Sequence, residues 1–172
     1  ELVAHIKAHQ GSLANVRVTS NILDVVARAG EVDAMEKLWG IFREEMQITP
    51  NLHMYDVMLG GYAAAGKELK VQDTMNTMLG ESLKVSARGF SLTIKGFLKN
   101  NMADAALRQI RAMKEVGFFV PPFAVAQVFR VAGDAGRTEE FMDALEALEV
   151  SLPAEGVTLL LDECCKHQKL EL

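Results

Sequence analysis

The stretch AAGKELKV, residues 64–71, decides the fold because close variants of it recur along the chain. Related stretches are RAGEVDAM at 28–35, KNNMADAA at 99–106 and DAGRTEEF at 134–141. The glycine or asparagine in each falls at Gly30, Gly66, Asn101 and Gly136, so the intervals are 36, 35 and 35 residues. A regular interval of this size is typical of helical repeat proteins.

Each recurring glycine or asparagine separates two stretches with apolar residues at helical spacing. Around Gly66 the apolar residues are Met54, Tyr55, Met58, Leu59 and Tyr62 before it, and Leu69, Met75, Met78 and Leu79 after it. Glycine, and next best asparagine, ends a helix where the backbone must become left-handed. The pattern therefore predicts an elbow between two helices at each of the four positions. The same interval matches Met78 with Met113 and then with Leu148.

A second set of junctions, rich in proline and small polar residues, separates the helix pairs at residues 48–51, 84–86 and 119–121. We expect helix pairs at 17–51, 52–86, 87–121 and 122–153, within one solenoid domain that covers residues 1–172. Residues 1–16 are expected to hold the second helix of a preceding repeat and a linker, and residues 154–172 a partial C-terminal repeat. The predicted fold is all-α: a right-handed α-solenoid of stacked antiparallel helix-turn-helix repeats of about 35 residues.

The composition is that of a folded soluble protein, with 172 residues of which 49% are hydrophobic and 24% charged. No apolar run approaches the roughly 18 residues of a membrane span, so no membrane insertion is expected. The net charge of −5 argues against a uniformly basic nucleic-acid binder, but it leaves room for a local basic surface. Cys164 and Cys165 are sequence neighbours and provide no disulfide framework, which favours a reducing compartment.

No catalytic or metal-binding motif is present in the sequence. His5 and His9 share a helix face, but the segment lacks the glutamate of the zinc protease motif and a third ligand. Gly60, Gly61 and Gly66 follow no strand and precede no Gly-Lys-Ser/Thr, so close helix packing explains them better than a phosphate loop. We therefore expect no enzymatic activity, no metal, no cofactor and no small-molecule substrate.

Several residues recur in the two central repeats at matching positions. The first of these repeats carries Pro50-Asn51, Tyr55, Gly61-Tyr62, Ala65-Gly66 and Met78, and the next carries Phe90, Gly96-Phe97, Ala105-Ala106-Leu107 and Met113. In these features the chain resembles the pentatricopeptide repeat family over about residues 17–167. The resemblance implies an organellar protein whose first helices line a groove for single-stranded RNA, with about one base for each repeat.

The resemblance also implies candidate RNA contacts. The expected base-edge pairs are Asn21 with Asn51, Asp56 with Ser86, and Ser91 with Pro121; Ala126 has no clear partner. The candidate stacking residues are Val18, His53, Arg88 and Phe123. Asn21 with Asn51 resembles the family's pyrimidine-preferring combinations, because an amide offers both a donor and an acceptor.

The placement of charge favours the same layer. The formal charges of the four first helices sum to +3, whereas those of the four second helices sum to −6. The basic residues of the first helices are Arg17, Arg28, Arg88, Lys95, Lys99 and Arg130. A basic inner layer behind an acidic outer layer is what a phosphate-tracking groove needs.

Two functions remain open at this point. The first is an organellar single-stranded RNA-binding protein that acts in RNA processing, stability or translation, in a mitochondrion or alternatively a plastid. The second is a non-catalytic structural subunit that holds proteins in a large organellar assembly, such as a ribosome or respiratory complex. The acidic total charge and the apolar faces of both expected terminal half repeats favour the second function.

Overall fold

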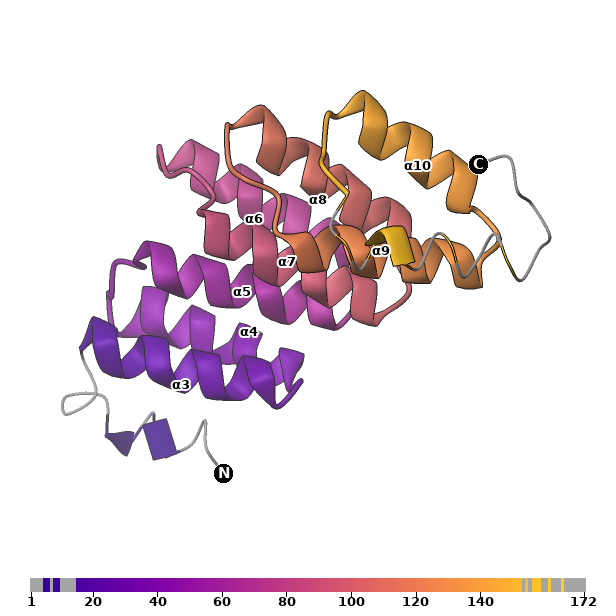
Figure 1. Cartoon of the computed structure of the whole chain (residues 1–172). Coiled ribbons are helices and arrows are strands. Elements are labelled where there is room, and N and C mark those ends of the chain that lie inside the picture. Colours follow the sequence, from indigo (N-terminus) through magenta and orange to yellow (C-terminus); the bar gives the residue numbers. More distant parts are fainter. Residues whose placement is uncertain are drawn as a thin grey trace. The chain divides into compact units, whose positions relative to one another are not determined.

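The structure, a computed structural model, describes residues 5, 6, 8, 9, 15–152, 154, 156–158, 161 and 165. The regular structure within this part of the chain is entirely helical (Figure 1). The expected half repeats at 1–16 and 154–172 lie mostly outside the described residues. The chain forms two compact units, Glu1–Gly96 and Phe97–Leu172, which are described separately below.

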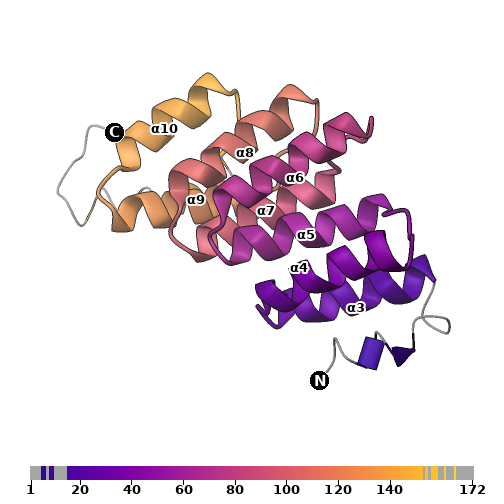
Figure 2. The same cartoon turned by 180° about the vertical axis from the view of Figure 1, so that it is seen from behind.

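The first unit contains two complete helix pairs and the beginning of a third. Its helices are α3 (Val16–Arg28), α4 (Val32–Gly40), α5 (Leu52–Ala64), α6 (Glu68–Gly80) and most of α7 (Ala87–Lys99). A π-helical segment, η1 (Ile41–Glu45), continues α4. Helix α5 packs against α3, α4 and α6 and is the most deeply buried helix of this unit (Figures 1 and 2).

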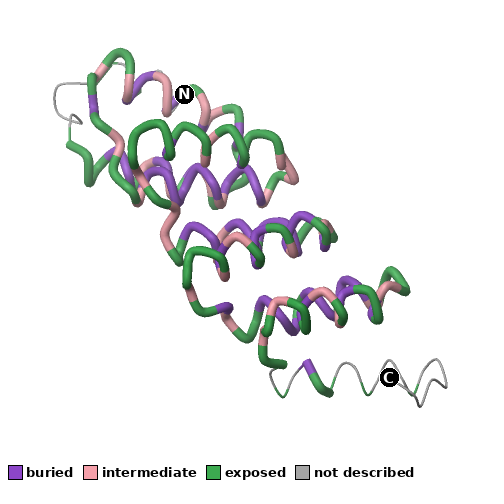
Figure 3. Tube along the Cα trace, turned by 90° about the horizontal axis from the view of Figure 1, so that it is seen from above, coloured by how far each residue is buried: buried purple, intermediate pink, exposed green. Residues whose placement is uncertain are grey.

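The second unit contains the end of α7 followed by α8 (Ala103–Glu115), α9 (Pro122–Asp134) and α10 (Thr138–Ala147). Helix α9 packs against both α8 and α10. In each unit the buried residues lie along the helix sides that face neighbouring helices, as the apolar spacing predicts (Figure 3).

The helix starts reproduce the repeat. First helices begin at residues 16, 52, 87 and 122, and second helices begin at 32, 68, 103 and 138. The predicted all-α fold of helix-turn-helix repeats of about 35 residues is confirmed. The prediction that one continuous solenoid domain spans residues 1–172 stays a prediction.

The four predicted elbow residues all have a left-handed backbone, with φ of 79° at Gly30, 69° at Gly66, 55° at Asn101 and 69° at Gly136. At each elbow two backbone hydrogen bonds close the preceding helix. For example, Gly66 N–H donates to Ala63 O at 3.0 Å and Lys67 N–H donates to Tyr62 O at 2.9 Å. This pair of backbone hydrogen bonds is the Schellman motif, which satisfies carbonyl groups that a helix end leaves unpaired.

The second junctions also turn at a left-handed residue, but one of the four is glycine and the other three are not. Gln47, Ser82, Gly117 and Glu149 have φ of 51°, 59°, 84° and 51°. The third interval in this series is 32 residues rather than 35 because α10 is three residues shorter than α8. As a result Leu145, not the predicted Leu148, is the buried residue equivalent to Met78 and Met113. Leu148 is the C-cap of α10.

The extra residue of the first repeat lies in η1. Ile48 N–H donates to Phe42 O at 2.8 Å, across six residues, whereas the equivalent bond from Leu83 N–H to Met78 O spans five. A π-helical turn holds one residue more than an α-helical turn. The 36-residue interval between Gly30 and Gly66 is therefore explained without any change at the elbows.

A cluster of aromatic and charged side chains joins η1 to the next repeat. Arg43 Nη2 and the Tyr55 hydroxyl donate to the two carboxylate oxygens of Glu81 at 2.8 and 2.6 Å. The Trp39 ring packs edge-on against the Tyr55 ring, with centroids 5.1 Å apart. Burial, reinforced by the bond to Glu81, raises the pKa of Tyr55 to about 12. Trp39 is thus a packing residue between repeats.

Glycine allows close helix contact at Gly96. A Cβ atom there would lie 2.5 Å from the backbone nitrogen of Ala64 and 2.7 Å from the Ala63 Cβ. These distances leave no room for a side chain between α5 and α7. Close packing also accounts for the helix-interior glycines singled out in the sequence, because a Cβ atom would lie 3.1 Å from Leu92 Cβ at Gly60 and 2.6 Å from Met35 Sδ at Gly61.

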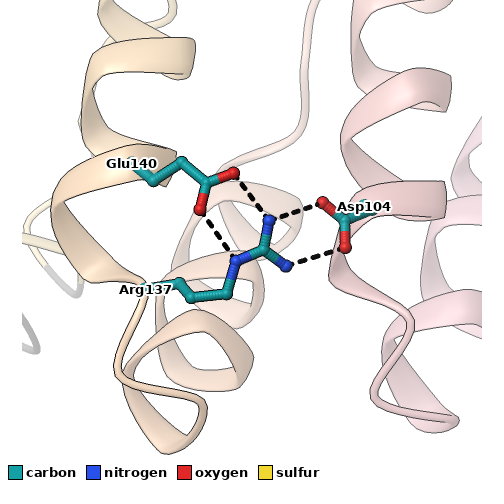
Figure 4. A network of polar contacts seen from close by, with 3 residues as sticks. All are labelled: Asp104, Arg137 and Glu140. Atoms are coloured by element: carbon teal, nitrogen blue, oxygen red, sulfur yellow. Dashed lines mark hydrogen bonds and ion pairs between the residues drawn. The ribbon is translucent and has the colours of Figure 1, made fainter.

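In the second unit, an arginine links successive second helices. The Arg137 guanidinium donates to both carboxylate oxygens of Asp104 at 2.8 and 2.9 Å and to both of Glu140 at 2.6 and 2.8 Å (Figure 4). These bonds lower the pKa values of Asp104 and Glu140. The planar guanidinium suits this arrangement because it offers five donors in fixed directions.

Candidate RNA-binding surface

The residue before each first helix is a capping position. Asn51 Oδ1 accepts from Met54 N–H at 2.9 Å, and Ser86 Oγ accepts from Gly89 N–H at 2.9 Å. Pro121 occupies the same position before α9 with φ of −64° and has no side-chain cap. Asn15, which the sequence reasoning did not single out, caps α3 by accepting from Arg17 N–H at 2.8 Å. Its position 36 residues before Asn51 could have identified it.

The pair Asp56 and Ser86 is bonded internally. The Ser86 hydroxyl lies 2.8 Å from each carboxylate oxygen of Asp56, whose exposed fraction is only 4%. Burial raises the pKa of Asp56, and the Ser86 hydrogen bond and the Arg88 charge oppose that shift. This carboxylate therefore joins α5 to the start of α7, and a base would have to compete with Ser86 for it.

The equivalent residues in the other repeats differ in exposure. Ser91 is partly exposed on α7 and Ala126 is buried on α9. The exposed Asn21 lies one residue past the equivalent position of α3, which the buried Ser20 holds. The Ser91 hydroxyl donates to the Ala87 carbonyl at 2.8 Å. Asn21 and Asn51 are thus the one predicted base-edge pair within the described residues in which both members are exposed and carry an amide.

The candidate stacking residues lie one to two residues into the first helices. Val18 and Phe123 are 36% and 37% exposed, Arg88 is exposed and His53 is half-buried. Arg88 Nη1 lies 2.6 Å from His53 Nδ1. A guanidinium carries only donors, so His53 Nδ1 accepts this hydrogen bond. The structure thus brings two candidate stacking residues of successive repeats into direct contact.

The predicted basic residues lie on the surface of the first helices. Arg17, Lys95 and Lys99 are exposed. Arg28 is also exposed but forms an ion pair with Asp24 one turn earlier on α3. In the first unit Arg17, Arg88 and Lys95 therefore contribute positive charge to this layer, and in the second unit Lys99 does so.

The described residues contain no group of three or more His, Cys, Asp or Glu side chains placed to hold a metal ion. Within that same part of the chain, no helix is both long and apolar enough to cross a membrane. The geometry found here is a planar or aliphatic side chain near the start of each first helix, with exposed basic side chains on α3, α7 and α9.

A search of solved structures found strong similarity to a known helical repeat protein. The crystal structure of the pentatricopeptide repeat protein PPR10 from maize matches 96% of this chain with a TM-score of 0.79 at 14% sequence identity. The chain has the pentatricopeptide repeat fold. Its resemblance to pentatricopeptide repeat proteins in the elbows and the repeat interval is thereby confirmed at the level of the fold.

A second pentatricopeptide repeat structure, PPR10 in complex with an 18-nt psaJ RNA element, matches 88% of this chain with a TM-score of 0.68 at 19% identity. This chain spans about a quarter of the length of both structures, 24% of the first and 23% of the second. No protein-family model matches the sequence, and the comparison with curated proteins found no match.

Proposed function

We propose that this chain binds single-stranded RNA along its first helices. The observation that carries the proposal is the regular placement of His53, Arg88 and Phe123 at the second residue of successive first helices, each at least partly exposed. Val18 is the third residue of α3, one residue past this position. Bases can stack on planar or aliphatic side chains at such an interval without sequence-specific contacts. The likeness to PPR10, which was solved in complex with an RNA element, supports the proposal.

The residues of this surface divide into three roles in the proposal. Arg88 and Phe123 offer planar faces for stacking, His53 extends the same series, and Val18 lies one residue past the equivalent position of α3. Arg17, Lys95 and Lys99 attract phosphates, with Arg28 contributing less because Asp24 neutralises it. Asn21 offers a donor and an acceptor to a base edge, and Asn51 offers the donors of its amide nitrogen because its Oδ1 caps α5. Asp56, Ser86 and Ser91 read a base only if their internal bonds open.

The proposed function is that of a non-catalytic RNA-binding factor that acts in RNA processing, stability or translation. An organellar location, mitochondrion or alternatively plastid, rests on the family resemblance alone. Single-strand binding through phosphates and stacking needs neither a cofactor nor a metal ion.

The salt dependence of RNA affinity tests the proposal. We expect the intact chain to bind a pyrimidine-rich oligoribonucleotide with an affinity that falls with salt. Lys95→Gln should reduce the slope of log K against log salt by up to about 0.7, the value expected for one phosphate contact on a single strand. Phe123→Ala should weaken binding by about 1–3 kcal/mol through lost stacking, with little change in the slope.

The matched control is Lys37→Gln, which removes the same charge from an exposed position on the second helix α4. It should leave both the affinity and the slope unchanged. If Lys37→Gln and Lys95→Gln have equal effects, the RNA is attracted by overall charge and does not follow the first helices. No binding at low salt would remove the proposal.

A protein-binding subunit of an organellar assembly remains the second candidate. The observation that favours it is the exposure of large apolar side chains away from the first-helix layer, 82% for Leu69, 73% for Leu79 and 77% for Phe119. Crosslinking the native protein in cell extracts would distinguish the two functions, because it identifies whether nucleotide or polypeptide is attached.

A further inference from the structure

The exposed face of α6 departs from the pattern that the chain's other second helices follow. Three residues after each elbow, the other repeats carry Asp33, Asp104 and Glu139, whereas the second repeat carries Leu69. A second comparison uses the position three residues before the left-handed residue that ends each repeat's second helix. The first, third and fourth repeats carry Glu44, Lys114 and Glu146 there, whereas the second repeat carries Leu79. The repeats thus provide an internal standard in which both positions are charged.

Leu69 and Leu79 belong to a ridge on α6 that also includes Gln72 and Asn76; these four residues are called the α6 ridge. At about 100° per residue they fall within about 80° of the helix circumference, and the two leucines lie about 15 Å apart along the axis. All four are exposed and none is charged. Gln72 Nε2 donates to Asn76 Oδ1 at 3.2 Å, so the two amides already lie side by side.

The spacing within the α6 ridge is symmetric, because the successive intervals from Leu69 through Gln72 and Asn76 to Leu79 are three, four and three residues. Reversing the direction of the helix therefore places leucine opposite leucine and amide opposite amide. A surface that matches itself under a two-fold rotation is the requirement for an isologous contact between identical chains.

We propose that the α6 ridge is a homodimer contact in which two copies of α6 pack antiparallel. Leu69 of each copy lies against Leu79 of the other, which removes the most exposed leucines from water. The amides meet at the centre. Asn76 Nδ2 of each copy donates to Gln72 Oε1 of the other copy. Together with the bond from Gln72 to Asn76 within each copy, these bonds join the four amides in a closed ring. Each amide in the ring donates one hydrogen bond and accepts one.

The expected dimer is weak. A contact confined to one 13-residue helix in each copy buries less than the roughly 1,200 Å² of standard stable interfaces. We therefore expect dissociation constants of about 10–100 µM, measurable by sedimentation equilibrium. The contact is on a second helix and goes beyond the proposed RNA binding, which uses first helices.

The experiment replaces the leucines with the charges found at the same positions of the third repeat, Leu69→Asp and Leu79→Lys. Each variant alone should weaken association at least tenfold while circular dichroism shows unchanged helix content. The matched control, Val25→Lys, charges an apolar side chain that is 62% exposed on α3 and should leave association unchanged.

A mixture of the two variants tests the antiparallel orientation. In the mixed dimer the new aspartate of one variant faces the new lysine of the other at one end, and the two unchanged leucines face each other at the opposite end. The mixture should associate more strongly than either variant alone, and about 1 M salt should abolish the gain. Three results would overturn the proposal: a wild-type chain that stays monomeric to about 500 µM, association unaffected by both variants, or a mixture without gain.

Discussion

At the scale of single residues, positions that are equivalent in the repeat differ in what their side chains do. Asp56, Ser91 and Ala126 each lie four residues after the start of their first helix, and Asp56 is bonded to a serine of the next junction. The exposed Asn21 lies five residues after the start of α3, where the buried Ser20 holds the equivalent position. The sequence predicted this register in three repeats because helical spacing is local, but its 35-residue interval missed the first repeat, whose helix start lies 36 residues before the next. It could not predict the exposure, because that depends on which side chain the neighbouring repeat brings close.

The buried carboxylate of Asp56 makes stability depend on pH. Its folded-state pKa lies above the ordinary value of 3.8, so the folded chain holds this proton more tightly than the unfolded chain. The stabilisation from protonated Asp56 is therefore present below pH 3.8 and is lost as pH rises through the folded-state pKa. Asp56→Asn removes the ionisation and keeps an acceptor for the Ser86 hydroxyl.

We expect Asp56→Asn to have a higher melting temperature than the wild type at pH 7, and the difference to vanish below pH 3.8. Thermal unfolding followed by circular dichroism across this range provides the measurement. Asp143→Asn, on the exposed surface of α10, serves as the control. A lower melting temperature for Asp56→Asn at pH 7 would show that its charge is stabilising in the folded chain.

At the scale of helices, the elbows were predicted from sequence and the π-helical segment was not. Glycine and asparagine at a left-handed position leave a signal in the sequence because few other residues adopt that backbone cheaply. The 36-residue interval showed that the first repeat holds an extra residue. It could not show where, since a π-helical turn requires no particular residue type.

Deleting Glu44 should convert η1 into an ordinary α-helical turn. The Ile48 N–H and Phe42 carbonyl would then be separated by five residues, as in the equivalent bond of the second repeat. Because Glu44 is exposed and the preceding core residues keep their positions, we expect the free energy of unfolding to be unchanged or higher. Chemical denaturation is the measurement.

The matched control is deletion of Asp73, an exposed residue in the regular helix α6. This deletion rotates Met78, which is fully buried, by about 100° away from the core. The deletion should lower the free energy of unfolding by about 2–5 kcal/mol or more, because this is the range for losing a buried methionine. Equal costs for the two deletions would mean that η1 contributes a contact that a regular helix cannot replace.

At the scale of the whole molecule, the fold is a repeat fold in which helices pack mainly on helices close to them in the sequence. Such arrays lose stability locally, because no single core connects distant repeats. The sequence predicted this architecture from the period alone. The candidate RNA surface was predicted only as positions, since the bond between Asp56 and Ser86 and the contact between His53 and Arg88 depend on side-chain packing.

Phe141→Ala tests this local character. Phe141, in α10, is 1% exposed. The Arg137 guanidinium lies over its ring, with Arg137 Cζ 5.0 Å from the ring centroid of Phe141. The truncation should lower the free energy of local unfolding around residue 141 by about 3–5 kcal/mol. Hydrogen exchange followed by mass spectrometry should show reduced protection in α8, α9 and α10 and unchanged protection in α3 and α4. A uniform loss along the chain would indicate a single cooperative core.

The intervals between helix starts also separate a constant part of each repeat from a variable part. In all four repeats, the second helix begins 16 residues after the start of the first helix. The π-helical insertion in the first repeat and the shortening of α10 in the fourth both fall after the elbow. The differences in length among the four repeats are thus confined to the stretch between one elbow and the next first helix. Repeats can therefore change length while the first helices keep their internal register.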